Sequence, residues 1–236
     1  MSAGESIMQV QILTWEFSVK RIRPSSEELI KKYNAIAHQW QQKIQQFGYD
    51  RVYATLFAGL HEVLRNHFAR HNTINVLDCG VGSGALSVAL YKSGHEHLTL
   101  QGVDTSPAMA SAARKHLAQQ DIPIRIEIQD VRSLPYDDNV FDMVMTAHTV
   151  EHLPQPQAGI EEMVRVLQPG APLLIVTTRP GLLGSLIDAQ WGLSCLSQSE
   201  LIAHLGKAGL CNVQLVPLRG PFWCRHMSYA VIGWKM

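Results

Sequence analysis

An acidic residue followed by three alternating glycines forms the stretch of this sequence with the clearest chemical potential. Asp78 ends the apolar run 74–77, and Gly80, Gly82 and Gly84 follow at every second position. Glycines let the backbone approach a ligand closely and adopt positive φ angles. The helix expected to begin near Gly84 would present free N–H groups to an anionic part of that ligand. The stretch therefore predicts a ligand with an adenosine and a small charged tail, bound where a buried strand ends.

Two histidines four residues apart, His148 and His152, form a second group with chemical potential. With Glu151 they make the string H-x-x-E-H, which also occurs in inverted zinc proteases. We discount a metal site, because those proteases carry the pair in a different fold with a distant acidic ligand. Histidine titrates near neutral pH and can take a proton from a hydroxyl, an amine or an acidic carbon. His148 is therefore a candidate general base, and a loop histidine with a hydrogen-bonded partner is the alternative interpretation.

The elements that must position these residues alternate between strands and helices from residue 74 onward. Strands are expected at 74–79, 98–104, 124–129, 140–146 and 172–178, with helices at 84–92, 107–120 and 156–167. This alternation predicts an α/β fold with a Rossmann-like, doubly wound, mostly parallel sheet of seven strands. Two final strands, 211–218 and 226–234, are too close for a helical crossover, so the last strand is expected to be antiparallel.

Two helices precede the first strand and are expected to cover the site as a lid. Ser25 and Glu28 are expected to form a capping box at the start of the first helix. Asp50 is expected to cap the second helix, which carries an apolar stripe at helical spacing. We therefore divide the chain into an N-terminal helical lid, residues 1–72, and a ligand-binding core, residues 73–236.

Composition and charge limit the class of protein. The 236 residues carry 20 Lys and Arg against 20 Asp and Glu, so the formal net charge is +0. A nucleic-acid binder would normally carry a basic surplus, and this balance argues against one. No apolar run is long enough to span a bilayer, and no signal peptide is evident at the N-terminus. The four cysteines lack CxxC spacing, which favours reduced thiols in a cytoplasmic protein.

Four segments in order resemble those of class I S-adenosylmethionine (SAM)-dependent methyltransferases. Residues 78–84 resemble the E/D-x-G-x-G-x-G loop, and residues 102–106 resemble the segment whose acid binds the ribose hydroxyls. Residues 129–136 with 141–144 resemble the D-x-x-x-L-P-F…F-D-x-V block, and residues 164–171 resemble V-L-K-P-G-G. The resemblance covers about residues 74–234. It is nearest to the ubiquinone/menaquinone-biosynthesis type and its small-molecule relatives.

The resemblance implies SAM as the cofactor and assigns roles to the residues that match its motifs. Asp78 would bind the methionyl ammonium, and Gly80 and Gly82 would contact the cofactor through their backbone. Asp104 would bind both ribose hydroxyls with its two acceptor oxygens, with Thr105 beside it.

Two of the three further cofactor contacts, Asp130 and Tyr33, each have an alternative interpretation. Asp130 would accept a hydrogen bond from adenine N6, with the N–H of Val131 near the ring, or it would only cap a turn. Tyr33 lies in a segment that resembles the Y-D-x-x-A stretch with which relatives close over SAM, or it packs the first helix on the core.

The acceptor is expected to be a small, hydrophobic or aromatic metabolite. Loops and a lid are where such folds build acceptor pockets, and the residues expected to bind it are His148, His152, Trp40, Trp191 and Trp223. The resemblance implies direct in-line methyl transfer with His148 as the candidate base. No motif indicates the accepting atom, the pathway or the oligomeric state.

Three other functions fit the same cofactor residues. The glycine string and Asp104 also satisfy the G-x-G-x-x-G/A fingerprint of NAD(P)-dependent oxidoreductases, although Asp78 inside the turn would repel a pyrophosphate. A protein of the same fold that performs non-methylating chemistry, such as cyclisation, would keep these residues. So would a scaffold that SAM merely stabilises.

Overall fold

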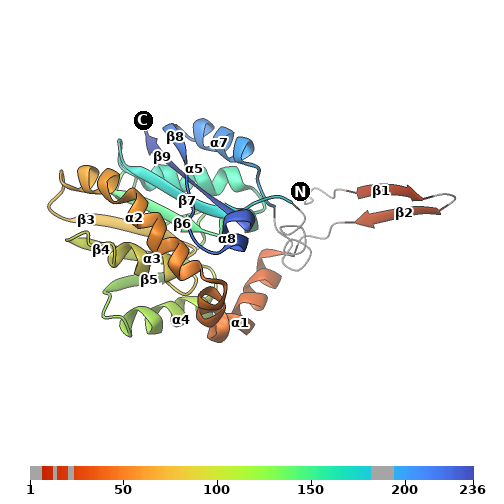
Figure 1. Ribbon diagram of the computed structural model, residues 1–236, viewed down its shortest axis with the longest axis horizontal. Helices are drawn as coiled ribbons and strands as arrows, with labels where there is room; N and C mark the ends of the chain where they lie inside the picture. The colour runs from red at the N-terminus through yellow and green to blue at the C-terminus, as the bar shows by residue number, and fades with distance from the viewer. Residues whose placement is uncertain (1–6, 13–14, 21–23, 182–193) are drawn as a thin grey trace.

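A seven-stranded sheet forms the centre of the molecule. The computed structural model describes residues 7–12, 15–20, 24–181 and 194–236. The strands of the sheet are β3 (Ile74–Cys79), β4 (Leu98–Asp104), β5 (Ile124–Ile128), β6 (Met143–Ala147), β7 (Pro172–Thr178), β8 (Leu210–Val216) and β9 (Ser228–Lys235). Their order is β5-β4-β3-β6-β7-β9-β8, and β9 is antiparallel to both of its neighbours whereas the other paired strands are parallel (Figure 1). The expected Rossmann-like sheet with an antiparallel last strand is confirmed.

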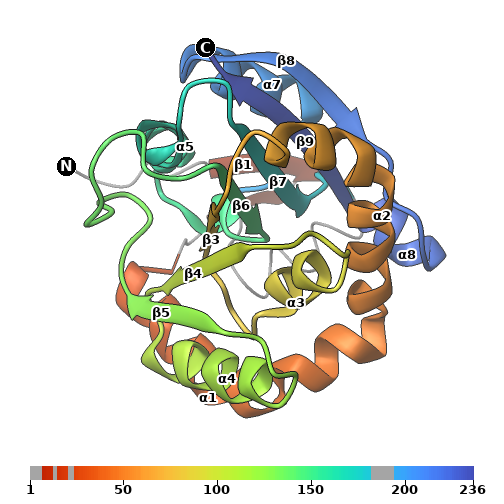
Figure 2. The same cartoon turned by 90° about the vertical axis from the view of Figure 1, so that its left-hand side faces the viewer.

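Helices cover both faces of this sheet, which makes three layers. One face packs against α2 (Tyr49–Phe68), α3 (Ala85–Tyr91) and α4 (Pro107–Ala118), and the other against α5 (Pro156–Val166) and α7 (Gln198–Lys207) (Figure 2). Successive side chains of a strand point to opposite faces. In β7, Leu174 therefore packs in the first layer of side chains and Leu173 in the second. Burial on both faces explains the near-continuous apolar runs of the sequence.

The two helices expected to form a lid differ in how deeply they are buried. In α1 (Ser26–Phe47) only Ala37 is buried, and the helix packs across α4. In α2 seven side chains are buried in the same cluster as the sheet, so α2 is part of the core. Only α1 has the position expected of a lid.

The ends of these two helices show one prediction confirmed and one wrong. Ser25 and Glu28 form the expected capping box, with Ser25 N–H donating to Glu28 Oε2 at 2.7 Å. Asp50 does not cap α2. A single residue, Gly48, with φ +79°, both ends α1 and begins α2, so no position remains for a separate side-chain cap.

Two local elements were not expected from the sequence. β1 (Ile7–Ile12) and β2 (Trp15–Lys20) form an antiparallel hairpin, which lies apart from the main sheet in Figure 1. A short helix, α8 (Phe222–Met227), fills the connection between β8 and β9, so β9 begins two residues later than expected. None of the helices in the described ranges is long and apolar enough to cross a membrane.

Candidate functional site

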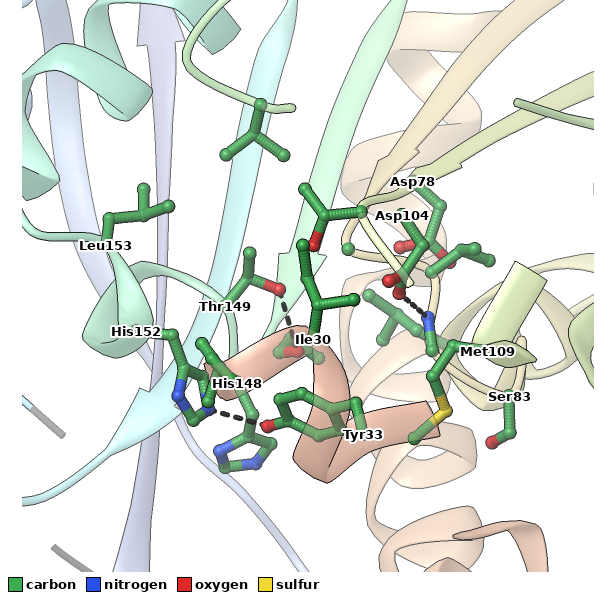
Figure 3. A pocket seen from close by; sticks show the side chains of 18 of the residues that line it. Ile30, Tyr33, Asp78, Ser83, Asp104, Met109, His148, Thr149, His152 and Leu153 are labelled. Atoms are coloured by element: carbon green, nitrogen blue, oxygen red, sulfur yellow. Dashed lines mark hydrogen bonds between the residues drawn. The ribbon is translucent and has the colours of Figure 1, made fainter. Parts of the chain in front are cut away.

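The main pocket of the described chain lies at the carboxyl ends of the parallel strands, beneath α1. It has a volume of about 170 Å³. Loops after four adjacent strands contribute to its wall, and α1 covers it (Figure 3). Its polar lining includes Asp78 near the end of β3, Asp104 at the end of β4, Asp130 after β5 and His148 after β6. The sheet topology thus brings together residues that are up to 70 positions apart in the sequence, as open α/β sheets do at this edge.

The glycine loop has the backbone conformation that the sequence predicts. Gly80, Gly82 and Gly84 have φ angles of +70°, +54° and +79°, which side chains rarely adopt. A Cβ on Gly80 would overlap the side chain of Thr149, with Cγ2 only 2.8 Å away. The loop is therefore packed directly against the chain that follows β6.

Asp78 is a buried carboxyl at the bottom of this loop. Its side chain is 2% exposed, and Ser87 Oγ donates a hydrogen bond to Oδ2 at 2.6 Å. Burial raises the pKa of Asp78 to about 7, and the negative charge of Asp104 contributes to the same increase. A cation bound beside Asp78 would favour the ionised carboxylate, which is the property expected of an ammonium site.

Asp104 is held by the backbone of two loops. Gly82 N–H donates to Oδ2 at 2.9 Å, and Ser106 N–H donates to Oδ1 at 2.8 Å. Burial raises the pKa of Asp104, and these two hydrogen bonds act against the increase. Asp104 and the exposed Thr105 both line the pocket, where a ribose diol would meet them.

Asp130 lies at the rim of the pocket and is engaged by its neighbour. The guanidinium of Arg132 bonds both carboxylate oxygens, and the backbone N–H of Arg132 donates to Oδ1 at 2.9 Å. The hydrogen bond from the Arg132 side chain lowers the pKa of Asp130. The carboxylate thus caps a turn, and an adenine amine would have to share it with Arg132. Val131 is buried and also lines the pocket.

Tyr33 connects the lid to the loop after β6. Its hydroxyl lies 2.8 Å from Nε2 of His152, on the short helix η1 (Val150–His152), as Figure 3 shows. Its ring also meets Trp40 edge-on, with centroids 5.7 Å apart. Burial raises the pKa of Tyr33 above its usual range and lowers that of His152 to about 4. Both side chains are therefore neutral at pH 7.

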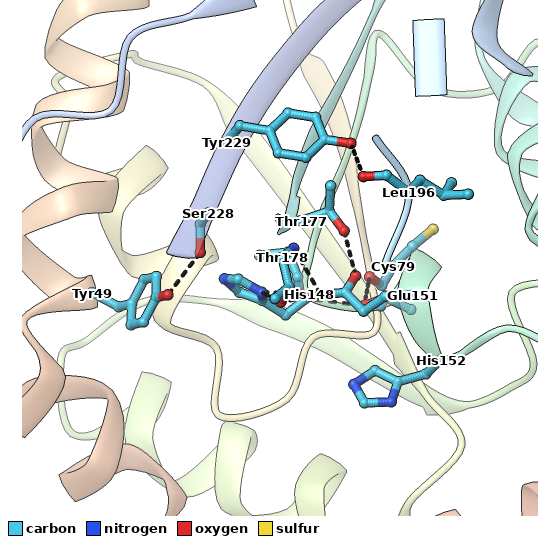
Figure 4. A network of polar contacts seen from close by, with 12 residues as sticks. Tyr49, Cys79, His148, Glu151, His152, Thr177, Thr178, Leu196, Ser228 and Tyr229 are labelled. Carbon is cyan, nitrogen blue, oxygen red and sulfur yellow. Dashed lines mark hydrogen bonds and ion pairs between the residues drawn. The ribbon is translucent and has the colours of Figure 1, made fainter. Parts of the chain in front are cut away.

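His148 combines an unusual backbone conformation with close polar contacts on one side of its ring. Its φ of +53° is unusual for a residue with a side chain. Nδ1 lies 3.1 Å from Glu151 Oε1 and 3.1 Å from Thr178 Oγ1 (Figure 4). Nε2 is buried and has no hydrogen-bond partner within the described ranges. Sequence analysis found Glu151 only as part of the H-x-x-E-H string and predicted no role for it in the site.

The tryptophans expected to bind the acceptor have different positions. Trp40 lines the pocket, near Gly82. Trp223, on α8, is not among the residues that line it: its side chain is 47% exposed, and Nε1 donates to the carbonyl of Phe47 at 2.9 Å. A role of Trp223 in binding the acceptor therefore stays a prediction. Trp191 lies outside the described residues.

Several lining residues had no signal in the sequence beyond helical or strand periodicity. They are apolar or aromatic and include Ile30, Ile44, Tyr53, Met109 and Leu153. Together they give the pocket a largely apolar wall beside the polar cofactor loops. Within the ranges that the structure describes, no three His, Cys, Asp or Glu residues are arranged to hold a metal ion.

Known sequences resemble the part of the chain that contains most of the polar residues of this pocket. A protein-family model for a methyltransferase domain matches residues 77–175. The chain is 36% identical over 103 residues to a ubiquinone biosynthesis O-methyltransferase of Coxiella burnetii (strain Dugway 5J108-111), covering 44% of this chain and 43% of that protein. It is 33% identical over 157 residues to the chloroplastic 2-methyl-6-phytyl-1,4-hydroquinone methyltransferase 1 of Oryza sativa subsp. japonica, covering 66% and 46%. The chain thus spans less than half the length of these relatives.

Comparison with solved structures supports the fold. The crystal structure of the [4+2]-cyclase SpnF superimposes with a TM-score of 0.68 over 91% of this chain and 97% of that one. The two sequences are 16% identical, so the similarity concerns the fold alone.

Proposed function

We propose that this chain, whose residues 77–175 match the model of a methyltransferase domain, is a class I SAM-dependent methyltransferase that transfers a methyl group to the hydroxyl of a small aromatic metabolite. The observation that carries the proposal is the position of His148. Its imidazole lines the same pocket as Asp78 and Asp104, and among the described residues its Nε2 has no hydrogen-bond partner. A cofactor site and a proton acceptor therefore share one cavity.

The residues present fit SAM. Asp78 would hold the cationic ammonium, Asp104 the ribose hydroxyls, and Val131 the adenine edge, while Gly80 and Gly82 would contact the cofactor through their backbone. When bound, SAM supplies a methyl group already activated by the sulfonium charge. The aromatic rings of Tyr33 and Trp40 lie on the lid side of the pocket, where their faces would favour that charge.

The protein would then orient the acceptor and receive its proton. An apolar wall excludes water and suits an aromatic ring, and proximity alone contributes strongly to transfer. As the new oxygen–methyl bond forms and the sulfur–methyl bond breaks, the hydroxyl proton would pass to Nε2 of His148. The names of the two relatives, which refer to ubiquinone and to a hydroquinone, support an aromatic hydroxyl compound as the acceptor.

The test supplies purified protein with SAM and one of three acceptors: a short-chain prenylated catechol, a prenylated hydroquinone, or an aliphatic alcohol of equal length. We expect S-adenosylhomocysteine and a methylated product, measured by mass spectrometry, with the aromatic acceptors only. Binding of SAM without release of S-adenosylhomocysteine would favour non-methylating chemistry or a scaffold. A thermal shift with NADH that exceeds the shift with SAM would favour an oxidoreductase.

The setting of the enzyme is part of the same proposal. The balanced net charge and the buried thiols of Cys79 and Cys224 support a cytoplasmic protein that acts on a small molecule and has no nucleic-acid partner.

A further inference from the structure

Glu151 is a buried carboxylate that is not among the residues lining the pocket. Its side chain is 1% exposed and lies at the ends of β6 and β7 (Figure 4). Thr177 Oγ1 donates to Oε2 at 2.7 Å, and Thr178 donates to Oε1 from its hydroxyl at 2.8 Å and from its backbone N–H at 3.1 Å. A buried charge is tolerated when it is hydrogen-bonded in this way, so these contacts fix the carboxylate in one position.

The charge state of Glu151 follows from its neighbours. Burial alone would raise the pKa of its carboxyl, but the hydrogen bond with His148, together with the charge of that imidazole when it is protonated, outweighs burial and lowers the pKa. Glu151 is therefore ionised at neutral pH. An ionised carboxylate can only accept hydrogen bonds.

This charge state determines which nitrogen of His148 carries hydrogen. Nδ1 lies 3.1 Å from Glu151 Oε1, and a contact between an acceptor-only oxygen and Nδ1 requires hydrogen on Nδ1. The Thr178 hydroxyl gives its only hydrogen to Glu151, so it too can only accept from Nδ1. In the neutral imidazole, Nε2 then keeps its lone pair, and Nε2 is the nitrogen that has no hydrogen-bond partner in the described part of the chain.

We propose that Glu151 is a positioning residue that holds His148 as the Nδ1–H tautomer, so that Nε2 accepts the proton of the acceptor hydroxyl. This inference rests on the proposed methyl transfer. The hydroxyl oxygen gains the methyl group that leaves sulfur, its proton moves to Nε2, and Glu151 stays ionised beside the imidazolium. The electron pair of the broken bond stays on sulfur, so the step needs no oxidant or reductant. The other groups that face His148 are the Tyr49 ring, with centroids 5.1 Å apart, and the neutral His152.

The first experiment reads the tautomer directly and needs no acceptor. Long-range ¹H–¹⁵N spectra are recorded on the full chain bound to S-adenosylhomocysteine, and His148 is assigned by its loss in His148→Asn. Asparagine suits this position because it tolerates positive φ. We expect hydrogen on Nδ1 in the wild type and a mixture of tautomers in Glu151→Gln, whose amide can donate or accept. Hydrogen on Nε2 in the wild type would overturn the proposal.

The second experiment measures single-turnover rates with SAM and a short-chain prenylated catechol. Glu151→Gln should lower the rate by about 10–100-fold, as loss of an orienting partner does elsewhere, with the affinity for S-adenosylhomocysteine unchanged. It should also move the acid limb of the pH–rate profile to lower pH, because the imidazolium loses a neighbouring charge. Thr146→Val is the matched control: Thr146 is equally buried on β6 but bonds only the Cys79 carbonyl at 2.7 Å.

The outcomes separate the two proposals. A wild-type rate and pH profile in Glu151→Gln, with loss of rate in His148→Asn, would overturn the positioning role and leave the base in place. A wild-type protein that methylates none of the acceptors would overturn the proposed function, and the tautomer spectra would still decide the geometry. If Thr146→Val lowered the single-turnover rate as much as Glu151→Gln, the effect of Glu151 would come only from the stability of the fold.

Discussion

The hydroxyl of Tyr33 and Nε2 of His152 lie 2.8 Å apart, although the two residues are 119 positions apart in the sequence. The contact belongs to a set that joins α1 to three loops of the site. Gln41 Oε1 accepts from Ser83 Oγ at 2.7 Å, after β3, and Asn34 Oδ1 accepts from Ser106 Oγ at 2.6 Å, after β4. Because only one apolar side chain of α1 is buried, we expect these polar contacts to contribute strongly to keeping α1 packed over the pocket.

Replacing Tyr33 with phenylalanine should loosen the lid. The substitution leaves a buried imidazole nitrogen unpaired, which typically costs about 1–3 kcal/mol. We expect SAM affinity to fall about 5–10-fold and backbone hydrogen exchange to rise in α1 but not in α2. Calorimetry and hydrogen-exchange mass spectrometry measure the two effects. Tyr91→Phe, on α3 and away from the pocket, serves as the control. Unchanged exchange in α1 would contradict a lid held by this contact.

Asp78 should lower the stability of the protein while it serves cofactor binding. Its pKa is raised by burial from an ordinary 3.8 to about 7, so the folded state binds the proton more tightly than the unfolded state. Stability contributed at low pH is therefore lost as pH rises through about 7. We expect Asp78→Asn to raise the free energy of unfolding by about 1–3 kcal/mol at pH 8 and little at pH 4.

The same variant should bind SAM much more weakly, which would separate stability from function at one position. Denaturant titration at the two pH values measures the first effect and calorimetry the second. Asp137→Asn, in an exposed loop, is the control and should change neither. If Asp78→Asn instead lowered the free energy of unfolding at pH 8, the protein would already stabilise the ionised carboxylate of Asp78 against the cost of burial.

Binding of SAM should release a proton below pH 7. A cation beside Asp78 favours the ionised carboxylate, whose pKa in the free protein is about 7. At pH 6 most of the free protein must lose this proton to bind, so affinity should fall by up to about tenfold per pH unit between 7 and 5. Calorimetry at pH 6 in two buffers with different ionisation enthalpies measures the released proton. An affinity that stays constant across this range would place the ammonium elsewhere.

The parts of the site that sequence predicted are those encoded by short local motifs. Asp78 and Asp104 each lie at the carboxyl end of a buried strand, and the parallel pairing of the two strands brings both to one edge. The role of Glu151 could not be read in the same way, because its partners Thr177 and Thr178 lie on a strand 26 and 27 residues later. Only the pairing of β6 with β7 brings them together.

Two further features could not be read from local sequence, for physical reasons. The segment of Trp223 has the pattern of a loop, but the short helix α8 forms there and the indole bonds the carbonyl of Phe47. A position before the first strand groups α2 with the lid, whereas its side chains pack in the core. Its apolar stripe, which includes Val52, Leu56 and Leu60, is wide enough for a core helix, and that width was the better signal.

Two glycine substitutions should separate backbone strain from steric overlap in the cofactor loop. Gly80 and Gly94 have similar φ angles, +70° and +86°, so alanine at either position should cost about 1–2 kcal/mol in backbone strain. Only at Gly80 does a new Cβ also meet a neighbour, the side chain of Thr149, whereas nothing lies within 4 Å at Gly94. We expect Gly80→Ala to be the less stable variant and to lose SAM binding, while Gly94→Ala keeps it. Thermal unfolding and calorimetry measure both, and equal SAM affinities would mean that Thr149 moves aside without displacing the loop.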